Sequence, residues 1–451
     1  MLAHLLAVLF VFPVEISANP GIEPGQQIVY HGNVTQRVVG PEQGTPQQKG
    51  FDLTWFVAEA DASGAKLDWL VEERGRGALP WVERFGQLNL DARGVPQGAS
   101  KPSLWFDYGE GESAISLPLP LVSLDQPLAK GLKWSDAGQK FDVLGEEKSD
   151  GRDTWQVRVG NDYGVKQTML VDKASPLLVS LAERVFMNKG TEYALEMKLA
   201  EINRPDATQQ KATFEVFGSM LALRAKLPRP PQSVNTDWTP AEIALLSAAL
   251  PELEKLAAGG PLARLIGVAA RDVQLQGGRA GEVTGLMAKF QGQPLPAISL
   301  PGLAGGTLSQ DDLAGQVTVL HFWDYRDVPL KEPYGQVGYL EFLYQKRKDQ
   351  GLKVYGVAVD GRLKDDADRR DALSGIRKLK AFMNLSYPLV LDSGAGIKAV
   401  GDPRLVGATL PLVIVVGRDG RIAHYHVGYY EVDRQEGLKE LDAAVTAAMQ
   451  R

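Results

Sequence analysis

The sequence predicts an α+β protein of several domains: an N-terminal antiparallel β-sheet domain, a helical connector and a C-terminal α/β domain. Three observations support this prediction. Residues 49–205 form short runs of alternating apolar and polar side chains, separated by turn signals. Residues 206–292 change to the spacing of amphipathic helices. Residues 293–451 alternate between apolar, strand-like runs and helix-like segments, the pattern of a sheet covered on both faces.

The first 48 residues are expected to precede the folded domains. Residues 1–18 contain an apolar stretch that is too short to span a bilayer as a helix and fits a secretory signal peptide. We therefore expect an exported chain, in the periplasm or cell envelope, with no transmembrane span after cleavage. An uncleaved anchor or a misassigned start codon is the alternative. Residues 19–48 are rich in Gly, Pro and Gln and are expected to form a flexible leader, although the run VYHGNVTQRVV could pair as an edge strand.

The β region, residues 49–205, contains successive strand-like runs such as FDLTWFVAEA and KLDWLVEE with hairpin-length gaps between them. Such gaps predict an antiparallel meander, whose sheet must curl or be covered on one face. The segment GNDYGVKQTMLVDKASPLLVSL resembles the long consecutive strands of lipoprotein-carrier proteins, which implies a half-barrel-like sheet and a hydrophobic ligand. The tryptophans of this region either line a ligand groove or, as we favour, belong to the β core: Trp55, Trp69, Trp81, Trp105, Trp134 and Trp155.

The connector, residues 206–292, begins with ATFEVFGSMLALRAKL, whose apolar positions follow helical spacing better than alternation. The run PRPPQ interrupts this pattern. A second helix is expected to begin at Thr239, which caps it, with Pro240 in the first turn and Glu242 completing a capping box. A glycine pair ends this helix, and PLARLIGVAARDVQLQGG predicts a third.

The chain contains no cysteine among its 451 residues. This excludes disulfide bonds, thiolate nucleophiles and cysteine-ligated metals. The formal net charge of −6 gives no reason to expect a nucleic-acid partner, which favours a basic surface. The sequence shows no Ser-His-Asp arrangement, phosphate loop or zinc-protease helix, and we expect neither a cofactor nor catalytic residues.

The C-terminal region, residues 293–451, carries a series of motifs in a fixed order. FWDYRDVPL joins the end of an apolar strand to a loop, ATLP places Pro411 directly before a strand, and VVGRDGRI predicts a hairpin through Asp419-Gly420. In their order and spacing these motifs resemble the thioredoxin-like superfamily, especially its exported thiol–disulfide reductases and peroxiredoxin-related redoxins. The resemblance implies a thioredoxin-like fold, an active-site loop within FWDYRDVPL and a cis-proline at Pro411.

The resemblance stops at the residues that carry the family's chemistry. Asp327 and Leu330 stand at the positions of the two thiols, and no cysteine elsewhere can replace them. Asp327, just ahead of a helix, is interpreted as an N-cap or loop residue, with an acid–base or ion-binding role as the alternative. His424 and His426 share one face of a strand, but no further ligand is evident, so we expect no metal site. His321, inside an apolar strand, is expected to be a core or edge histidine with its hydrogen bonds satisfied.

In the family, the edge beside the cis-proline holds extended substrate polypeptide, and this binding could survive the loss of chemistry. We therefore predict a polypeptide-binding edge formed by Trp323, Tyr325, Arg326, Leu410 and Pro411. The leading functional hypothesis is a non-catalytic binding or scaffolding protein of the cell envelope. One alternative is a redoxin-like oxidoreductase by descent whose chemistry does not use its own cysteine. Another is a lipid or hydrophobic-ligand carrier that acts through the β domain.

Overall fold

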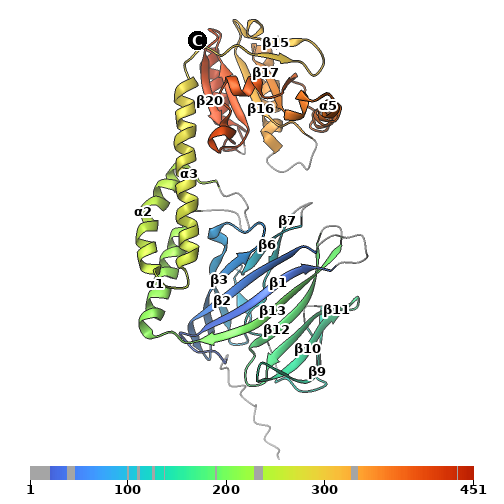
Figure 1. Cartoon of the computed structure of the whole chain (residues 1–451), viewed down its shortest axis with the longest axis vertical. Coiled ribbons are helices and arrows are strands. Elements are labelled where there is room, and N and C mark those ends of the chain that lie inside the picture. The colour runs from blue at the N-terminus through green and yellow to red at the C-terminus, as the bar shows by residue number, and fades with distance from the viewer. Residues whose placement is uncertain are drawn as a thin grey trace, which may run out of the picture. The chain divides into compact units, whose positions relative to one another are not determined.

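The computed structural model describes residues 21–37, 46–98, 101–108, 112–123, 127–136, 138–187, 190–227, 237–326, 334–433 and 435–451. The chain forms two compact units, Met1–Gln274 and Leu275–Arg451, which divide within helix α3, Ala263–Phe290 (Figure 1). The expected signal peptide, residues 1–18, lies outside the described residues. Among the described helices, none is both long enough and apolar enough to cross a membrane.

The first unit is built mainly from strands, whose bounds among the described residues are β1 (Gln27–Gln36), β2 (Gln48–Asp61), β3 (Gly64–Arg74), β4 (Phe85–Asp91), β5 (Pro96–Gln97), β6 (Ser103–Asp107), β7 (Glu112–Ser116), β8 (Lys133–Asp136), β9 (Gln139–Ser149), β10 (Arg152–Asn161), β11 (Gly164–Asp172), β12 (Leu178–Met187) and β13 (Thr191–Asn203). All but β6 and β7 form one 11-stranded sheet with the order β5-β4-β3-β2-β1-β13-β12-β11-β10-β9-β8 (Figure 1). Neighbouring strands in this sheet are antiparallel, as the meander pattern predicts. β6 and β7 form a separate hairpin.

Strand β1 lies in the middle of the large sheet, between β2 and β13, and pairs with both. Ile28, Tyr30 and Val34 on β1 are fully buried. The expectation that residues 19–48 form a flexible leader, or at most an edge strand, is therefore wrong for Gln27–Gln36. The physical reason is that β1 joins the two halves of the sheet, and pairing between segments so distant in sequence leaves no local signal.

Alternating side chains divide the large sheet between two cores. On β2, Trp55 and Val57 point into a core that extends along most of the sheet, whereas Phe56 faces the opposite side. Trp55, Trp69 and Trp81 are 0%, 2% and 3% exposed, which confirms for these three the interpretation as core residues.

Helices cover the second core of this unit: α1 (Ala207–Arg224), α2 (Pro240–Ala257) and the first part of α3. The predicted capping box of α2 is present, because Thr239 Oγ1 accepts from the Glu242 N–H at 3.2 Å and Glu242 Oε2 accepts from the Thr239 N–H at 2.8 Å. Asp272 on α3 accepts hydrogen bonds from the indole N–H groups of Trp81 (3.2 Å) and Trp238 (2.9 Å). These contacts tie α3 to the start of α2 and to the short 3-10 helix η1 (Trp81–Glu83).

The second unit contains strands and helices in alternation, with the bounds β14 (Ser299–Pro301), β15 (Thr307–Ser309), η2 (Asp311–Leu313), β16 (Thr318–Trp323), η3 (Tyr334–Gln336), α4 (Val337–Arg347), η4 (Lys348–Gln350), β17 (Lys353–Val359), η5 (Gly361–Lys364), α5 (Asp366–Phe382), β18 (Leu389–Asp392), α6 (Ala395–Ala399), η6 (Pro403–Val406), β19 (Leu412–Val416), β20 (Ile422–Val427) and α7 (Lys439–Met449). Five strands form a sheet in the order β18-β17-β16-β19-β20. β16, β17 and β18 are parallel, and the predicted β19–β20 hairpin is antiparallel. Helices α4, α5 and α7 pack on one face, while α6 and the end of α3 pack on the other.

A buried ion pair stabilises the first unit where β2, β3 and β6 meet. Lys49 Nζ lies 2.5 Å from Glu73 Oε2, and the two side chains are 2% and 0% exposed. Glu73 also accepts hydrogen bonds from the backbone N–H groups of Leu79 (2.9 Å) and Trp105 (3.0 Å). Lys49 Nζ donates to the carbonyl of Gly77 at 2.7 Å. Both charges are therefore compensated inside the protein, and each holds a loop or hairpin in place.

We expect Lys49→Met to destabilise the first unit by about 3–5 kcal/mol, because Glu73 is then left charged and buried without its cation. Tryptophan fluorescence during urea unfolding measures this loss, since Trp323 is the only one of the eight tryptophans outside the first unit. The control is Lys66→Met, which removes an exposed pair with Glu59 worth at most about 1 kcal/mol. A loss no larger than the control's would contradict the prediction.

Candidate functional site

The carboxyl ends of three parallel strands meet at one edge of the second sheet, and an aspartate marks each end. Asp324 follows β16, Asp360 follows β17, and Asp392 is the last residue of β18. The antiparallel strand β19 begins at the same edge, because Leu412 pairs with Phe322. Ligands of open α/β sheets bind at this edge. We call it the carboxyl edge and treat it as the candidate site.

The Leu410-Pro411 turn lies at the carboxyl edge, directly before β19 and beside Trp323. The peptide bond of this turn is cis, as the resemblance implied. Pro411 is buried, and its carbonyl accepts a hydrogen bond from the Gly428 N–H at 2.8 Å. Leu410 is only partly buried, and its backbone N–H and C=O have no hydrogen-bond partner within the described part of the chain. Leu410 therefore carries the main-chain groups that a ligand can use.

Tyr325 turns inward at the start of the loop. Its side chain is 0% exposed, and its backbone has a left-handed φ of 44°. The Tyr325 hydroxyl lies 2.7 Å from His321 Nδ1 and 3.1 Å from the Tyr387 hydroxyl. The three buried polar side chains form one continuous hydrogen-bonded chain.

Tyr325 is one of the residues predicted to form the polypeptide-binding edge, but its ring cannot contact a ligand at the surface, because the structure places it in the interior. The interior has room for it at Gly356 on β17, where a Cβ would lie 2.4 Å from the Tyr325 hydroxyl oxygen. Trp323 remains partly exposed and packs edge-on against Tyr325, with ring centroids 5.4 Å apart. The sequence held two signals of this arrangement: a histidine within the β16 run and a glycine within the β17 run.

Three Asp-x-Arg pairs lie at the carboxyl edge. In each pair the guanidinium Nε and Nη2 groups donate to the carboxylate two residues earlier, with Nη2–Oδ2 distances of 2.5, 2.8 and 2.7 Å in Asp324–Arg326, Asp360–Arg362 and Asp402–Arg404. The arginine side chains are 41%, 37% and 47% exposed. In all three the remaining nitrogen, Nη1, has no hydrogen-bond partner within the described residues. Each pair is neutral overall and keeps a charge-assisted donor available.

The three pairs are close enough to act on one another electrostatically. The hydrogen bond to Asp324 raises the pKa of Arg326, and the charge of Asp360 adds to this effect. The hydrogen bond to Asp402 likewise raises the pKa of Arg404, and the charge of Asp324 contributes there. The pairs thus form one polar surface at the carboxyl edge.

Sequence reasoning identified Arg326 at this edge but missed Arg362 and Arg404. The available signal was the repeat of Asp-x-Arg: DYR and DGR each follow an apolar strand, and DPR lies shortly before β19. Asp327 and Leu330, at the positions of the two thiols, lie outside the described residues. That they replace the two cysteines of the family rests on the sequence resemblance alone.

We expect His321 alone to lower the free energy of unfolding of the second unit by roughly 2 kcal/mol between about pH 7 and pH 5. Burial lowers the pKa of His321 from 6.5 to about 3 in the folded protein, so over this range only the unfolded chain takes up the proton and stability is lost as the pH falls. Pulse proteolysis in urea, with fragments of the second unit quantified by mass spectrometry, measures the change. The variant His321→Gln should lose this part of the pH dependence; equal pH dependence in both proteins would contradict the prediction.

Comparison with known proteins gives the second unit a family context. The model of the AhpC/TSA family matches residues 291–425, and no curated protein matches the chain. Matching solved structures include a putative thiol:disulfide interchange protein DsbE from Chlorobium tepidum, with 23% identity over 35% of this chain and 97% of that chain and a TM-score of 0.27. A putative protein disulfide isomerase from Bacteroides thetaiotaomicron matches with 20% identity over 36% of this chain and 91% of that chain, with a TM-score of 0.29.

The match to the family model completes the assignment of the fold of the second unit. The family-model match covers β16 to β19 and most of β20, the strands that form the second sheet, and it includes the cis Leu410-Pro411 turn. The cysteine-free chain is therefore a multidomain α+β protein whose C-terminal domain is thioredoxin-like.

Proposed function

We propose that the thioredoxin-like domain is a non-catalytic binding domain that holds an extended polypeptide segment at the carboxyl edge. The whole chain would then act as a binding or scaffolding protein in the cell envelope. The observation that carries this proposal is the backbone of Leu410, which has no partner among the described residues, beside Trp323 and the three Asp-x-Arg pairs. The location in the envelope is supported by the signal-like residues 1–18.

The chemistry of the carboxyl edge suits an extended segment. The N–H and C=O groups of Leu410 can pair with the main chain of such a segment, as in the addition of a strand to a sheet edge. The partly exposed Trp323 supplies apolar contact surface. The Nη1 groups of the three arginines, which have no partner among the described residues, can donate to backbone carbonyls or to acidic side chains of the segment.

Thiol-based catalysis has no residue to carry it in this chain. Thiol–disulfide exchange begins with attack by a thiolate, and the 451 residues contain no cysteine. The inward turn of Tyr325 also gives the start of the loop an internal anchor through His321. These features favour a domain that retains the binding edge of its fold without the reaction.

We expect the purified protein to reduce no insulin disulfides in the presence of dithiothreitol beyond the rate of a heat-denatured sample, because no thiolate is available to shuttle electrons. The turbidity of precipitating insulin chains measures the reaction. A thiol-coupled peroxidase assay, followed by NADPH oxidation, should be equally negative. Turnover above the denatured control in either assay would sink the proposal of a non-catalytic domain.

We expect the wild-type chain to bind acidic, unstructured peptides and the triple variant Arg326→Lys/Arg362→Lys/Arg404→Lys to bind them about tenfold more weakly, a loss of about 1.4 kcal/mol. Lysine keeps the positive charge, but its single ammonium group cannot donate in parallel to the aspartate and to a ligand as the planar guanidinium does. A peptide array followed by fluorescence anisotropy on the strongest peptides measures this difference.

A matched control is Arg421→Lys. Arg421 has the same spacing after Asp419 but lies in the β19–β20 turn, at the opposite end of β19 from Leu410. This variant should bind the peptides as the wild type does. The proposal fails if the wild type binds no peptide, or if the triple variant and the control bind equally well.

A further inference from the structure

Two histidines of β20 and a glutamate of α7 come together at the edge of the second sheet. β20 is an edge strand, and His424 and His426 lie on the same face as their β19 partners, Val415 and Val413. Helix α7 packs on this face. Glu440, in the first turn of α7, brings its Oε1 to 4.0 Å from His424 Nε2 and 3.6 Å from His426 Nδ1.

The expectation of no metal site rested on the lack of a further ligand beside the two histidines, and Glu440 supplies a third candidate ligand. One ligand atom from each of His424, His426 and Glu440 lies within 4.8 Å of the other two. Zinc bonds of about 2.1 Å at tetrahedral angles place ligand atoms roughly 3.4 Å apart. Because the Glu440 side chain is 59% exposed, it can move the short distance that this geometry requires.

The imidazole of His426 has an unused nitrogen. Its Nε2 is buried and has no hydrogen-bond partner within the described residues. The ring is 19% exposed and stacks on Tyr430, with ring centroids 3.8 Å apart, so it is held in a fixed plane. The ring nitrogen that faces the Glu440 carboxylate is Nδ1, at 3.6 Å from Oε1, and the fixed ring plane holds Nδ1 in this direction.

The groups around the three side chains are compatible with a bound ion. The hydroxyl of Tyr430 lies 2.9 Å from His424 Nε2, so metal binding there exchanges one hydrogen bond for a coordination bond. The neighbouring cation Lys439 pairs with Glu436 at 3.0 Å and leaves the carboxylate of Glu440 to the histidines.

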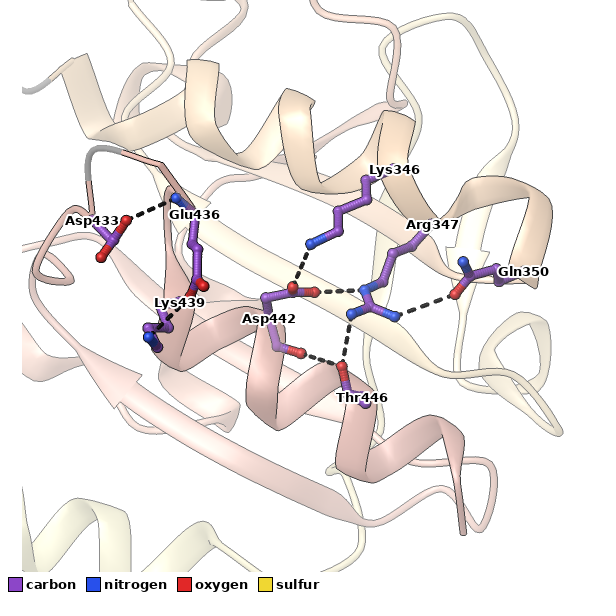
Figure 2. A network of polar contacts seen from close by, with 8 residues as sticks. All are labelled: Lys346, Arg347, Gln350, Asp433, Glu436, Lys439, Asp442 and Thr446. Atoms are coloured by element: carbon purple, nitrogen blue, oxygen red, sulfur yellow. Dashed lines mark hydrogen bonds and ion pairs between the residues drawn. The ribbon is translucent and has the colours of Figure 1, made fainter.

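Helix α7 is fixed in place close to Glu440. Figure 2 shows the Asp442 side chain in contact with Lys346 and Arg347 of α4, accepting hydrogen bonds from Lys346 Nζ (2.7 Å) and Arg347 Nε (2.5 Å). Arg347 Nη2 also donates to Thr446 Oγ1 at 2.8 Å, one turn further along α7 (Figure 2). These contacts hold the first turns of α7 against α4, so Glu440 is presented to β20 from a rigid element.

We propose that His424, His426 and Glu440 bind one Zn²⁺ ion that links the edge strand β20 to helix α7. Two imidazoles and one carboxylate are a ligand set that zinc accepts, and three protein ligands leave one position for water. This zinc site uses β20 and α7 and is independent of polypeptide binding at the carboxyl edge.

The test uses the full chain, produced without a histidine tag and freed of metal with EDTA. Isothermal titration with ZnCl₂ should show one equivalent bound, and Co²⁺ in place of zinc should give the visible absorption of a four-coordinate ion. Glu440→Gln and His426→Gln should each weaken zinc binding by at least about tenfold. Since Glu440 is mostly exposed, its variant keeps the test valid even if a histidine variant fails to fold.

The matched control is His31→Gln in the first unit. His31 Nδ1 lies 2.6 Å from Asp52 Oδ1, so it is another histidine beside a carboxylate, but 62% exposed and without a second imidazole ligand. The control should bind zinc with the affinity of the wild type. The proposal is overturned if the wild type binds no zinc, or if Glu440→Gln and His426→Gln bind it as tightly as the control does.

Discussion

The hydrogen bond between Tyr325 and His321 is the interaction on which the carboxyl edge depends. It joins the start of the loop to the middle of β16, and Tyr387 extends the chain toward β18. All three groups are buried, so removing one would leave the others without a partner at a cost of roughly 1–3 kcal/mol. These hydrogen bonds therefore anchor Tyr325, the second residue after β16, in the interior of the domain.

Because the start of the loop is anchored in the interior, the groups available at the carboxyl edge are the Asp-x-Arg side chains and the backbone of Leu410. The thioredoxin-like domain keeps the strand order and the cis Leu410-Pro411 turn of its fold, but it has no thiol. A fold supports function only through the groups at its site. In the function that we propose, those groups are the arginine side chains and the Leu410 backbone. The histidines of β20 and the glutamate of α7 are a separate set, which we propose as a metal site.

The first unit follows a different constraint, the need to cover a sheet of eleven strands. Strict alternation on β2 and β3 sends one set of side chains into the long core and the other set toward the helices. The buried Lys49–Glu73 pair lies on one side of this sheet, and the partly buried Asp272 carboxylate makes hydrogen bonds on the other. Helix α3 passes from the first unit into the second, so the connector belongs partly to each.

The sequence by itself determined the elements whose causes are local. The capping box at Thr239, the hairpin through Asp419-Gly420 and the absence of thiol chemistry all follow from neighbouring residues or from composition. Only the tertiary structure decided which distant groups meet. It places β1 between β2 and β13, the Tyr325 hydroxyl beside His321 and Tyr387, and Glu440 beside the two histidines. The physical reason is that burial and long-range pairing depend on the packing of whole elements, which spacing along the chain does not record.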